Sequence, residues 1–323
     1  MNAWQRFRAR PGAVAGLVAL AALGLLAILA DLCAADLPLA VRVDGHTYLA
    51  PCLLRPPALL DDDQQSLARR AEWMVGTPIP YGPLASHPGG VDAPLSPPSR
   101  QHLVGTDDRG RDVAARLLHG TRTALAVGLF AAATFLAIGL LLGCACGIGR
   151  GTDLVVARLI EVGSVVPAYF LLLAVQAAAA GARAASVMEV ALAIALTRWP
   201  EVARVTRAEV LRVKRAPHVE AARALGLSDA QVALRHVLPL AAGPGLVAAA
   251  LGVGQAVLLE AGLSFLGFGV AAPTPSWGGL LSAASGAGLP AHLIVAPALA
   301  IAVTVLSAGR VAEGLQAVLD PRS

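Results

Sequence analysis

Six mostly apolar runs of about 20 residues or more divide this chain, and they decide what it can fold into. A helix of that length spans the hydrocarbon core of a membrane, because each residue adds about 1.5 Å. The chain is 56% hydrophobic and only 14% charged, whereas a soluble domain carries roughly 25% charged residues. We therefore predict an all-α polytopic membrane protein with six transmembrane helices. The predicted spans are Val14–Ala34, Ala124–Cys146, Leu154–Ala178, Val187–Val205, Leu240–Leu263 and His292–Ala312.

Two of these runs depart from a plain membrane span. The first run follows a basic segment, as the apolar region of a signal peptide does. However, it is longer than the roughly 7–15 apolar residues of a signal peptide. No clear cleavage site follows it, so we predict a retained anchor. The fourth run is the weakest, because Arg198, Pro200 and Glu201 interrupt it.

The placement of arginines predicts the orientation in the membrane. Arginines precede the first span, flank the link between the second and third, and crowd the link between the fourth and fifth. Because basic residues favour the cytoplasmic side, we expect both termini in the cytoplasm. The net charge of +4 reflects this asymmetry. No basic stripe is interleaved with aromatic residues, so nucleic acid is not an expected partner.

Residues 35–120 form a long insert that we place on the outer side. The stretch Val41–Leu49 alternates around an Asp-Gly pair, which favours a tight hairpin. The acidic run Asp61–Asp63 precedes a helical stretch that we expect to reach about Val75. Prolines and glycines dominate residues 81–99, which we expect to be irregular. These patterns therefore predict a periplasmic insert with a mixture of strands, helix and irregular structure.

The segment before the second span is predicted to hold a short interfacial helix. Thr106 or Asp107 would cap it, and Val113 and Leu117 would share its apolar face.

Two cysteines lie on the predicted outer side, Cys33 and Cys52, where oxidation is possible. A disulfide between them is one of two open alternatives, the other being two free thiols.

The polar link between the fourth and fifth spans reads as a helix-turn-helix. A short helical pattern begins at Glu220, and Gly226 suits the left-handed residue that ends a helix. Ser228 and Gln231 form a capping box for a second helix. Pro239 stands at the head of the next apolar run, where its missing N–H costs little. The residues singled out here are Glu220, Ala221, Ala222, Gly226 and Pro239.

The motifs of soluble enzymes are missing from the sequence. The single lysine, Lys214, follows a valine, so no phosphate-binding loop is present. Nucleophile elbows and zinc-protease motifs are also absent, and we predict neither an enzymatic activity nor a cofactor or metal.

Ionisable residues inside spans are the remaining candidates for function, because a buried charge is costly in lipid. Arg198, Glu201 and Arg204 are spaced three apart on one face. An internal ion-pair row is one interpretation of this spacing, and snorkelling of these side chains at the cytoplasmic end is the favoured one. Glu161 follows close after an arginine near the inner end of its span. For Glu260 a structural role and a pathway-lining role both stay open.

Three stretches of sequence resemble one family. The spacing E-A-A-x3-G-x12-P from residue 220 resembles the coupling loop of permease subunits of binding-protein-dependent ABC importers. GTDDRGRD at 105–112 and EAGLSFLGFG at 260–269 are similar to motifs of the dipeptide, oligopeptide and nickel branch. The close, EGLQAVLDPR, also looks like that branch, and the ends of the outer insert resemble Yej-type permeases for microcin C and peptides.

This resemblance implies a type I ABC importer permease fold with a defined organisation. Residues 1–34 would hold the N-terminus and first helix, 35–120 the periplasmic insert, and 121–314 the transmembrane domain of five helices. The coupling loop would cover about 206–239, and residues 315–323 would form a cytoplasmic tail.

The resemblance also implies a function and partners. The chain would form half of the pathway for peptides or peptide-like solutes in a bacterial inner membrane. A second homologous permease, two cytoplasmic ABC ATPases carrying ATP and Mg, and a periplasmic or lipid-anchored binding protein would complete the importer. Nickel or another small solute is an alternative cargo. An ion-coupled secondary transporter and a structural scaffold are rivals that do not explain the coupling loop.

Overall fold

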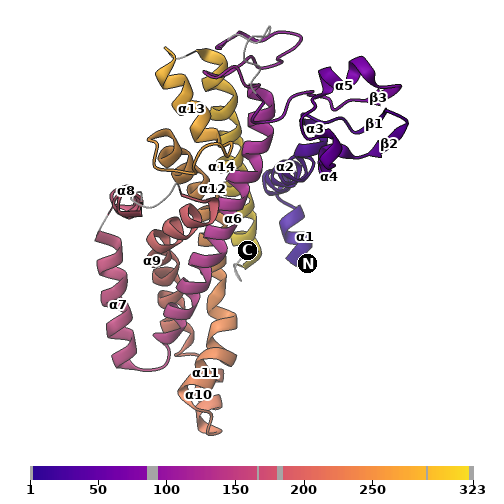
Figure 1. The fold of residues 1–323 in the computed structure, drawn as a ribbon. Coiled ribbons are helices and arrows are strands. Elements are labelled where there is room, and N and C mark those ends of the chain that lie inside the picture. Colours follow the sequence, from indigo (N-terminus) through magenta and orange to yellow (C-terminus); the bar gives the residue numbers. More distant parts are fainter. Residues whose placement is uncertain (1–2, 86–93, 166, 180–184, 289, 320–323) are drawn as a thin grey trace. The chain divides into compact units, whose positions relative to one another are not determined.

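The computed structural model describes residues 3–85, 94–165, 167–179, 185–288 and 290–319. Helices dominate this part of the chain (Figure 1). The chain divides into two compact units, one made of residues 1–20, 126–260 and 303–323, the other of 21–125 and 261–302. Each unit is built from segments that are distant in the sequence, because long helices run from one unit into the other.

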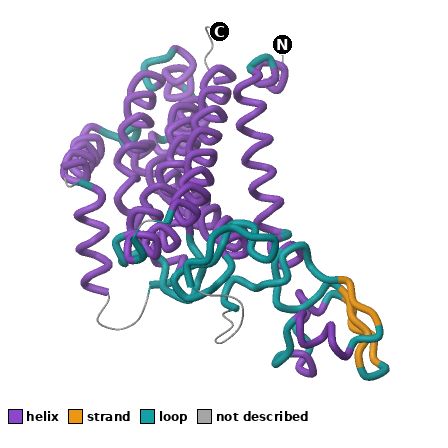
Figure 2. Tube along the Cα trace, turned by 90° about the horizontal axis from the view of Figure 1, so that it is seen from above, coloured by secondary structure: helices purple, strands orange, loops and turns teal. Residues whose placement is uncertain are grey.

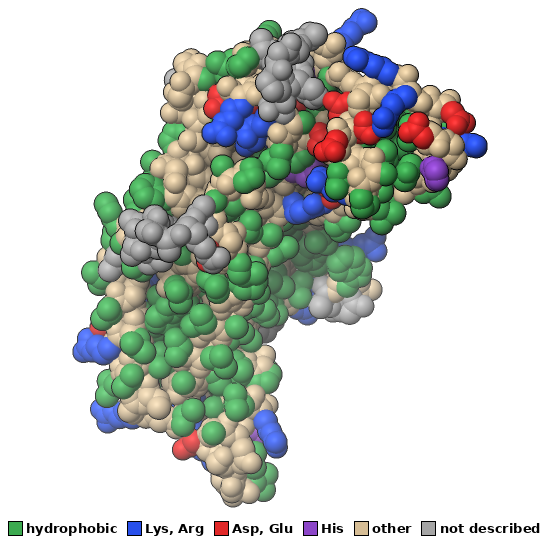
Figure 3. All heavy atoms as spheres, viewed as in Figure 1, with side chains coloured by type: hydrophobic (Ala, Val, Ile, Leu, Met, Phe, Trp, Pro, Cys, Tyr) green, Lys and Arg blue, Asp and Glu red, His purple; other side chains and the backbone are tan. Residues whose placement is uncertain are grey.

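Four helical segments of the described chain are long and apolar enough to cross a membrane. Hydrophobic side chains cover much of the helical surface visible in Figure 3, as expected for helices that face lipid. These segments are α2 (Pro11–Ile28), α6 (Val113–Ala145), the run Asp229–Phe265 that ends in α12 (Leu238–Phe265), and α14 (Ala291–Leu319).

The remaining two predicted spans are not confirmed as single spanning helices. The third is broken near Pro167 into α7 (Arg150–Val165) and α8 (Ala168–Ala179), which count as a fifth span only when taken together. Proline lacks the N–H that a continuous helix needs, so a break here is expected. The fourth lies in α9 (Val187–Val213), whose charged residues keep it below the hydropathy of the other segments.

Close helix packing explains how α9 fits into its unit. Gly139 and Gly143, one turn apart on α6, face α9, and a methyl group added at either would lie within 2.6 Å of Val202 or Thr206. Small residues at this spacing let two helix backbones approach closely. Helix α9 is therefore packed side by side with the spanning helix α6 inside this unit.

Three helix boundaries differ from the sequence predictions. The first predicted span ends at Ile28, and a separate short helix α3 (Ala30–Cys33) follows. The interfacial helix predicted after Thr106 is wrong: α6 begins at Val113 and runs without interruption into the span. Helix α14 continues to Leu319, so the expected tail from residue 315 begins inside this helix.

The insert folds around a three-stranded antiparallel sheet in the order β2-β1-β3 (Figure 2). The predicted hairpin is confirmed, since Asp44 and Gly45 adopt the positive φ angles of a tight two-residue turn. The helix expected to reach Val75 is shorter, because the chain instead forms a strand that pairs with β1. The strands are β1 (Ala40–Val43), β2 (His46–Leu49) and β3 (Trp73–Val75).

Helices cover one face of this sheet and leave the other bare. Asp63 caps α5 (Gln64–Arg70) by accepting a hydrogen bond from the Ser66 N–H at 2.7 Å. A small core of Leu37, Val41, Val43, Leu59 and Leu67 lies under the sheet. The short helices α4 (Pro51–Leu54) and η1 (Pro57–Leu59) connect β2 to this core.

The structure decides between the two alternatives for Cys33 and Cys52. Both cysteines are free thiols, and Cys52 is buried. The free-thiol alternative therefore holds in this structure. At the N-terminal end of the chain, the short helix α1 (Ala3–Arg8) precedes α2.

Candidate functional site

The link between α9 and α12 contains the helix-turn-helix that the sequence predicts. Helix α10 (Pro217–Ala224) begins three residues earlier than expected, with Pro217 at its first position. Gly226 has a φ of +86°, its N–H bonds to the Arg223 carbonyl at 2.9 Å, and the Leu227 N–H bonds to the Ala222 carbonyl at 3.4 Å. This pair of bonds is the glycine stop signal of a helix, so the predicted end is confirmed.

The second half of the link is a helix that does not stop before the apolar run. Ser228 caps α11 (Asp229–Val232), and its Oγ accepts from the Gln231 N–H at 3.4 Å, while Gln231 Oε1 accepts from the Ser228 N–H at 3.0 Å. Helix α11 continues through a π-helical turn, η2 (Ala233–Val237), into α12. Pro239 therefore lies just inside a continuous helix rather than at its start, and the π turn next to it loosens the regular bonding there.

A small apolar core holds the link together. Val219 and Ala222 on α10 are buried against residues of α9, α11 and α12. Glu220 and Ala221 are exposed on the same helix, and Leu225 is 82% exposed at its end. Helix α10 thus has one face that fixes it to its own chain and another that is open. The buried residues of this core are Val210, Val213, Val219, Ala222, Val232, Val237 and Ala241.

Ion pairs brace the link from two sides. Arg223 of α10 lies 3.3 Å from Asp229 of α11, across the turn that Gly226 makes. Arg207 of α9 donates two hydrogen bonds to the Asp153 carboxylate on α7, at 2.7 and 3.1 Å. A bidentate pair of this kind fixes orientation as well as distance. The first pair therefore ties α10 to α11, and the second ties α9 to α7.

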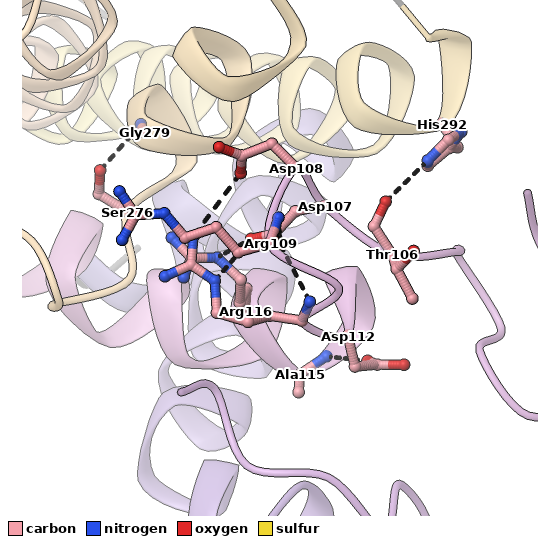
Figure 4. A network of polar contacts seen from close by, with 11 residues as sticks. Thr106, Asp107, Asp108, Arg109, Asp112, Ala115, Arg116, Ser276, Gly279 and His292 are labelled. Carbon is pink, nitrogen blue, oxygen red and sulfur yellow. Dashed lines mark hydrogen bonds and ion pairs between the residues drawn. The ribbon is translucent and has the colours of Figure 1, made fainter. Parts of the chain in front are cut away.

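A second polar cluster surrounds the Thr-Asp-Asp-Arg-Gly-Arg-Asp motif (Figure 4). The Asp107 carboxylate is completely buried and accepts hydrogen bonds from the Arg111 Nε at 2.8 Å and from the backbone N–H groups of Arg109 and Arg111. Arg116, on the first turn of α6, places its Nε 3.4 Å from the same carboxylate. Gly110 turns the chain between them with a φ of +74°. The motif thus encloses one carboxylate between two guanidinium groups.

Asp112 uses its carboxylate to begin the spanning helix. Its Oδ1 accepts from the Ala115 N–H at 2.7 Å, and its Oδ2 lies 2.8 Å from His102 Nδ1. The predicted caps, Thr106 and Asp107, serve the preceding turn instead. Thr106 Oγ1 accepts from the Ser96 N–H at 2.8 Å.

The Trp-Gly turn near residue 277 belongs to the same unit. Ser276 caps α13 (Trp277–Gly286), and the buried Trp277 donates its indole N–H to the Leu117 carbonyl of α6 at 3.0 Å. Thr123 donates to the Pro275 carbonyl at 2.9 Å. This stretch is therefore the packed start of a helix.

The intramembrane ionisable candidates do not form one cluster. Arg198 pairs with Glu201 at 2.7 Å, whereas Arg204 donates to Ser164 Oγ at 2.6 Å. Glu161 pairs with its neighbour Arg158 on exposed helix surface. Glu260 is fully buried in α12.

Sequence reasoning missed the partners of the second cluster. The sequence alone predicts no role for Arg116 or His102, which contact Asp107 and Asp112. The only sequence signal is an arginine in the first turn of an apolar helix. That signal is weak, because it does not indicate that a carboxylate in the preceding loop pairs with the arginine. Among the described residues, no group of three or more His, Cys, Asp or Glu could hold a metal ion.

Comparison with known proteins identifies the class of this fold. A profile described as "Binding-protein-dependent transport system inner membrane component" matches residues 124–323. A second, the "N-terminal TM domain of oligopeptide transport permease C", matches residues 1–51. The chain belongs to the permease family of binding-protein-dependent ABC importers. It is a multi-pass membrane protein and a transport subunit rather than an enzyme.

Relatives of known name support this assignment. The glutathione transport permease GsiD of Pectobacterium atrosepticum is 35% identical over 70% of this chain and 74% of its own. The dipeptide transport permease DppC of Alkalihalophilus pseudofirmus is 34% identical over 71% and 74%. A structure of the MetNI methionine ABC transporter in inward-facing conformations covers 62% of this chain and 96% of its own at 18% identity, with a TM-score of 0.50, which shows likeness of fold.

Proposed function

We propose that this chain forms half of the translocation pathway of an ATP-driven importer for peptides or peptide-like solutes. The named relatives carry glutathione, dipeptides and peptides, which supports this cargo class. The likeness of the outer insert to Yej-type permeases supports peptide-like cargo as well. Nickel or another small solute is the second candidate, because the resembling branch includes nickel importers.

The observation that carries the mechanism is that only one face of α10 is buried. Val219 and Ala222 fix the helix to its own chain, whereas Glu220, Ala221 and Leu225 are open to a partner. In this proposal the open face docks in a groove of an ABC ATPase, and Gly226 and Pro239 shape the chain on either side. Movement of the ATPase then reaches the spans through α9, which is packed against α6.

The remaining assembly follows from the same proposal. A second homologous permease supplies the other half of the pathway, two cytoplasmic ATPases bind ATP and Mg, and a periplasmic or lipid-anchored binding protein delivers the solute. Helix α9 and the α7–α8 pair complete six spans in the bacterial inner membrane, with both termini cytoplasmic. Glu260, Glu201, Arg198 and Glu161 are the candidate polar residues of the pathway.

A substitution on the open face of α10 tests the docking role. Ala221→Trp adds bulk to the open face, so we expect it to weaken copurification of the ATPases and to abolish uptake. The thermal stability of the purified permease should stay unchanged, because Ala221 makes no core contact. Full ATPase association and full uptake with Ala221→Trp would contradict the docking role.

Cysteine labelling tests the orientation. Ala68 is exposed on α5 of the insert, and Ser228 is exposed at the α10–α11 turn. An impermeant maleimide should label Ala68→Cys in intact spheroplasts and Ser228→Cys only after the membrane is opened. The reverse pattern would place the termini outside the cytoplasm and exclude the ATPase docking role of α10.

A further inference from the structure

The bare face of the insert sheet carries an apolar surface that the transport mechanism does not use. Residues 52–123, which hold most of the insert, lie outside both family profiles. Leu49 of β2 and Val75 of β3 both pair with Ala40 of β1, so they lie in one row on one face. Leu49 is 70% exposed and Val75 is 51% exposed.

Neighbouring residues extend this surface. Trp73 of β3 pairs with Arg42 of β1, two residues along, and therefore shares the bare face. Leu53 and Leu54 follow β2 directly in α4, at 51% and 75% exposure. We call this set the sheet patch: Leu49, Leu53, Leu54, Trp73 and Val75. The patch is apolar and includes one tryptophan, and the Arg42–Glu72 ion pair lies beside it, with 3.1 Å between the two charged groups.

Short hydrogen-bonded connections hold the sheet at the end of the first membrane span. Only Ala34–Leu39 separate α3 from β1, a distance of at most about 20 Å for an extended chain. The chain that leaves β3 returns to the same place, because the Ile79 N–H bonds to the Cys33 carbonyl at 2.9 Å. Gln64 of α5 also donates to the Ala35 carbonyl at 2.8 Å. The insert therefore has little freedom to leave the membrane surface.

The end of the first span, to which the insert is attached, is held by contacts with α6. Arg122 of α6 donates to the Ala27 carbonyl at 3.1 Å and to Asp31 at 2.9 Å, and His119 lies 2.9 Å from the Ala34 carbonyl. Ile28, the last residue of α2, is 74% exposed on a helix of membrane-spanning length. The lipid-facing surface of α2 thus continues within a few residues into the insert.

We infer that the sheet patch is a membrane-interface surface, which contacts the acyl-chain and headgroup boundary of the lipid layer next to the first span. Tryptophan and leucine side chains favour this boundary, because the indole ring has an apolar body and a polar N–H. Arg42 is paired with Glu72 at 3.1 Å, so the contact with lipid is carried by the apolar side chains of the patch. The acidic segment Asp61–Asp63 begins α5, which covers the opposite face of the sheet, away from anionic headgroups.

Spin-label accessibility in nanodiscs of phosphatidylethanolamine and phosphatidylglycerol tests this inference. Full-length permease carrying Leu54→Cys should relax more with oxygen, which is concentrated in lipid, than with a water-soluble nickel chelate. The matched control is Ala68→Cys, at an exposed position of α5, and it should relax more with the nickel chelate than with oxygen. Unmodified permease reports labelling of its four native cysteines.

A second readout needs no added cysteine. Lipids brominated near the headgroup should quench part of the tryptophan fluorescence, and Trp73→Phe should remove that part. Equal nickel-chelate access at residues 54 and 68, with no loss of quenching in Trp73→Phe, would overturn the inference. Protection of Leu54→Cys that appears only after the binding protein is added would assign the patch to a protein partner instead. Neither result depends on transport, so failure here is distinct from failure of the proposed function.

Discussion

Arg111 donates its Nε–H to the fully buried carboxylate of Asp107 at 2.8 Å, and Arg116 approaches the same carboxylate from the first turn of α6. The Asp107 carboxylate is therefore the buried counter-charge that Arg111 and Arg116 share at the start of a membrane helix. Removing one partner of a buried pair is costly because it leaves the other charge uncompensated.

Asp107→Asn should destabilise this permease by about 3 kcal/mol, since Arg111 and Arg116 would lose their shared counter-charge. Thermal unfolding in detergent measures the effect. Asp108→Asn is the control, because Asp108 is partly exposed and its carboxylate lies 3.8 Å from Arg111, too far for a hydrogen bond. This substitution should cost less than about 1 kcal/mol. Equal effects from the two substitutions would show that burial of Asp107 does not matter.

Gly226→Val should impair ATP-driven uptake while the subunit still inserts. No atom lies within 4 Å of an added Cβ, so the cost comes from the positive φ alone, roughly 1 kcal/mol or somewhat more for a branched residue. Gly226→Asn should retain most uptake, because asparagine tolerates this conformation. Uptake assays in membranes with equal subunit amounts measure both, and wild-type uptake by the valine variant would contradict the assignment.

Ala222→Trp should damage the link in a different way from Ala221→Trp. Ala222 is only 6% exposed in the core beneath α10, so an indole there cannot fit without displacing Val219 and Val232. We expect lower thermal stability as well as lost ATPase association. Ala221→Trp should lose association alone, and a loss of stability in both variants would mean that α10 has no open face.

Cys33 and Cys52 should differ in reactivity. Burial raises the pKa of the Cys52 thiol above its ordinary value, so at neutral pH its thiolate fraction is smaller than that of an ordinary thiol. Maleimide should label Cys33, which is partly exposed, faster than Cys52, and labelling of Cys52 should increase as the pH rises. Cys33→Ser should leave thermal stability unchanged under oxidising conditions, whereas a clear loss would indicate a disulfide.

Local features of the fold were predictable because their physical cause is contained in a few neighbouring residues. The apolar runs indicated the long helices, and Asp44-Gly45 indicated the hairpin. Gly226 and the capping box at Ser228 indicated the two halves of the link. In each case the chain conformation follows from hydropathy, from a positive φ, or from a bond spanning three residues.

The amino-acid sequence by itself therefore determined the membrane class, the helix-turn-helix and the family. Tertiary structure alone decided which side of α10 is buried, since Val219 and Ala222 meet residues of α11 and α12 that no local pattern specifies. It also decided that residues 73–75 pair with β1 instead of extending α5, and that Asp107 joins Arg111 with Arg116. These outcomes depend on contacts between distant segments, whose free energy is gained only when the whole unit packs.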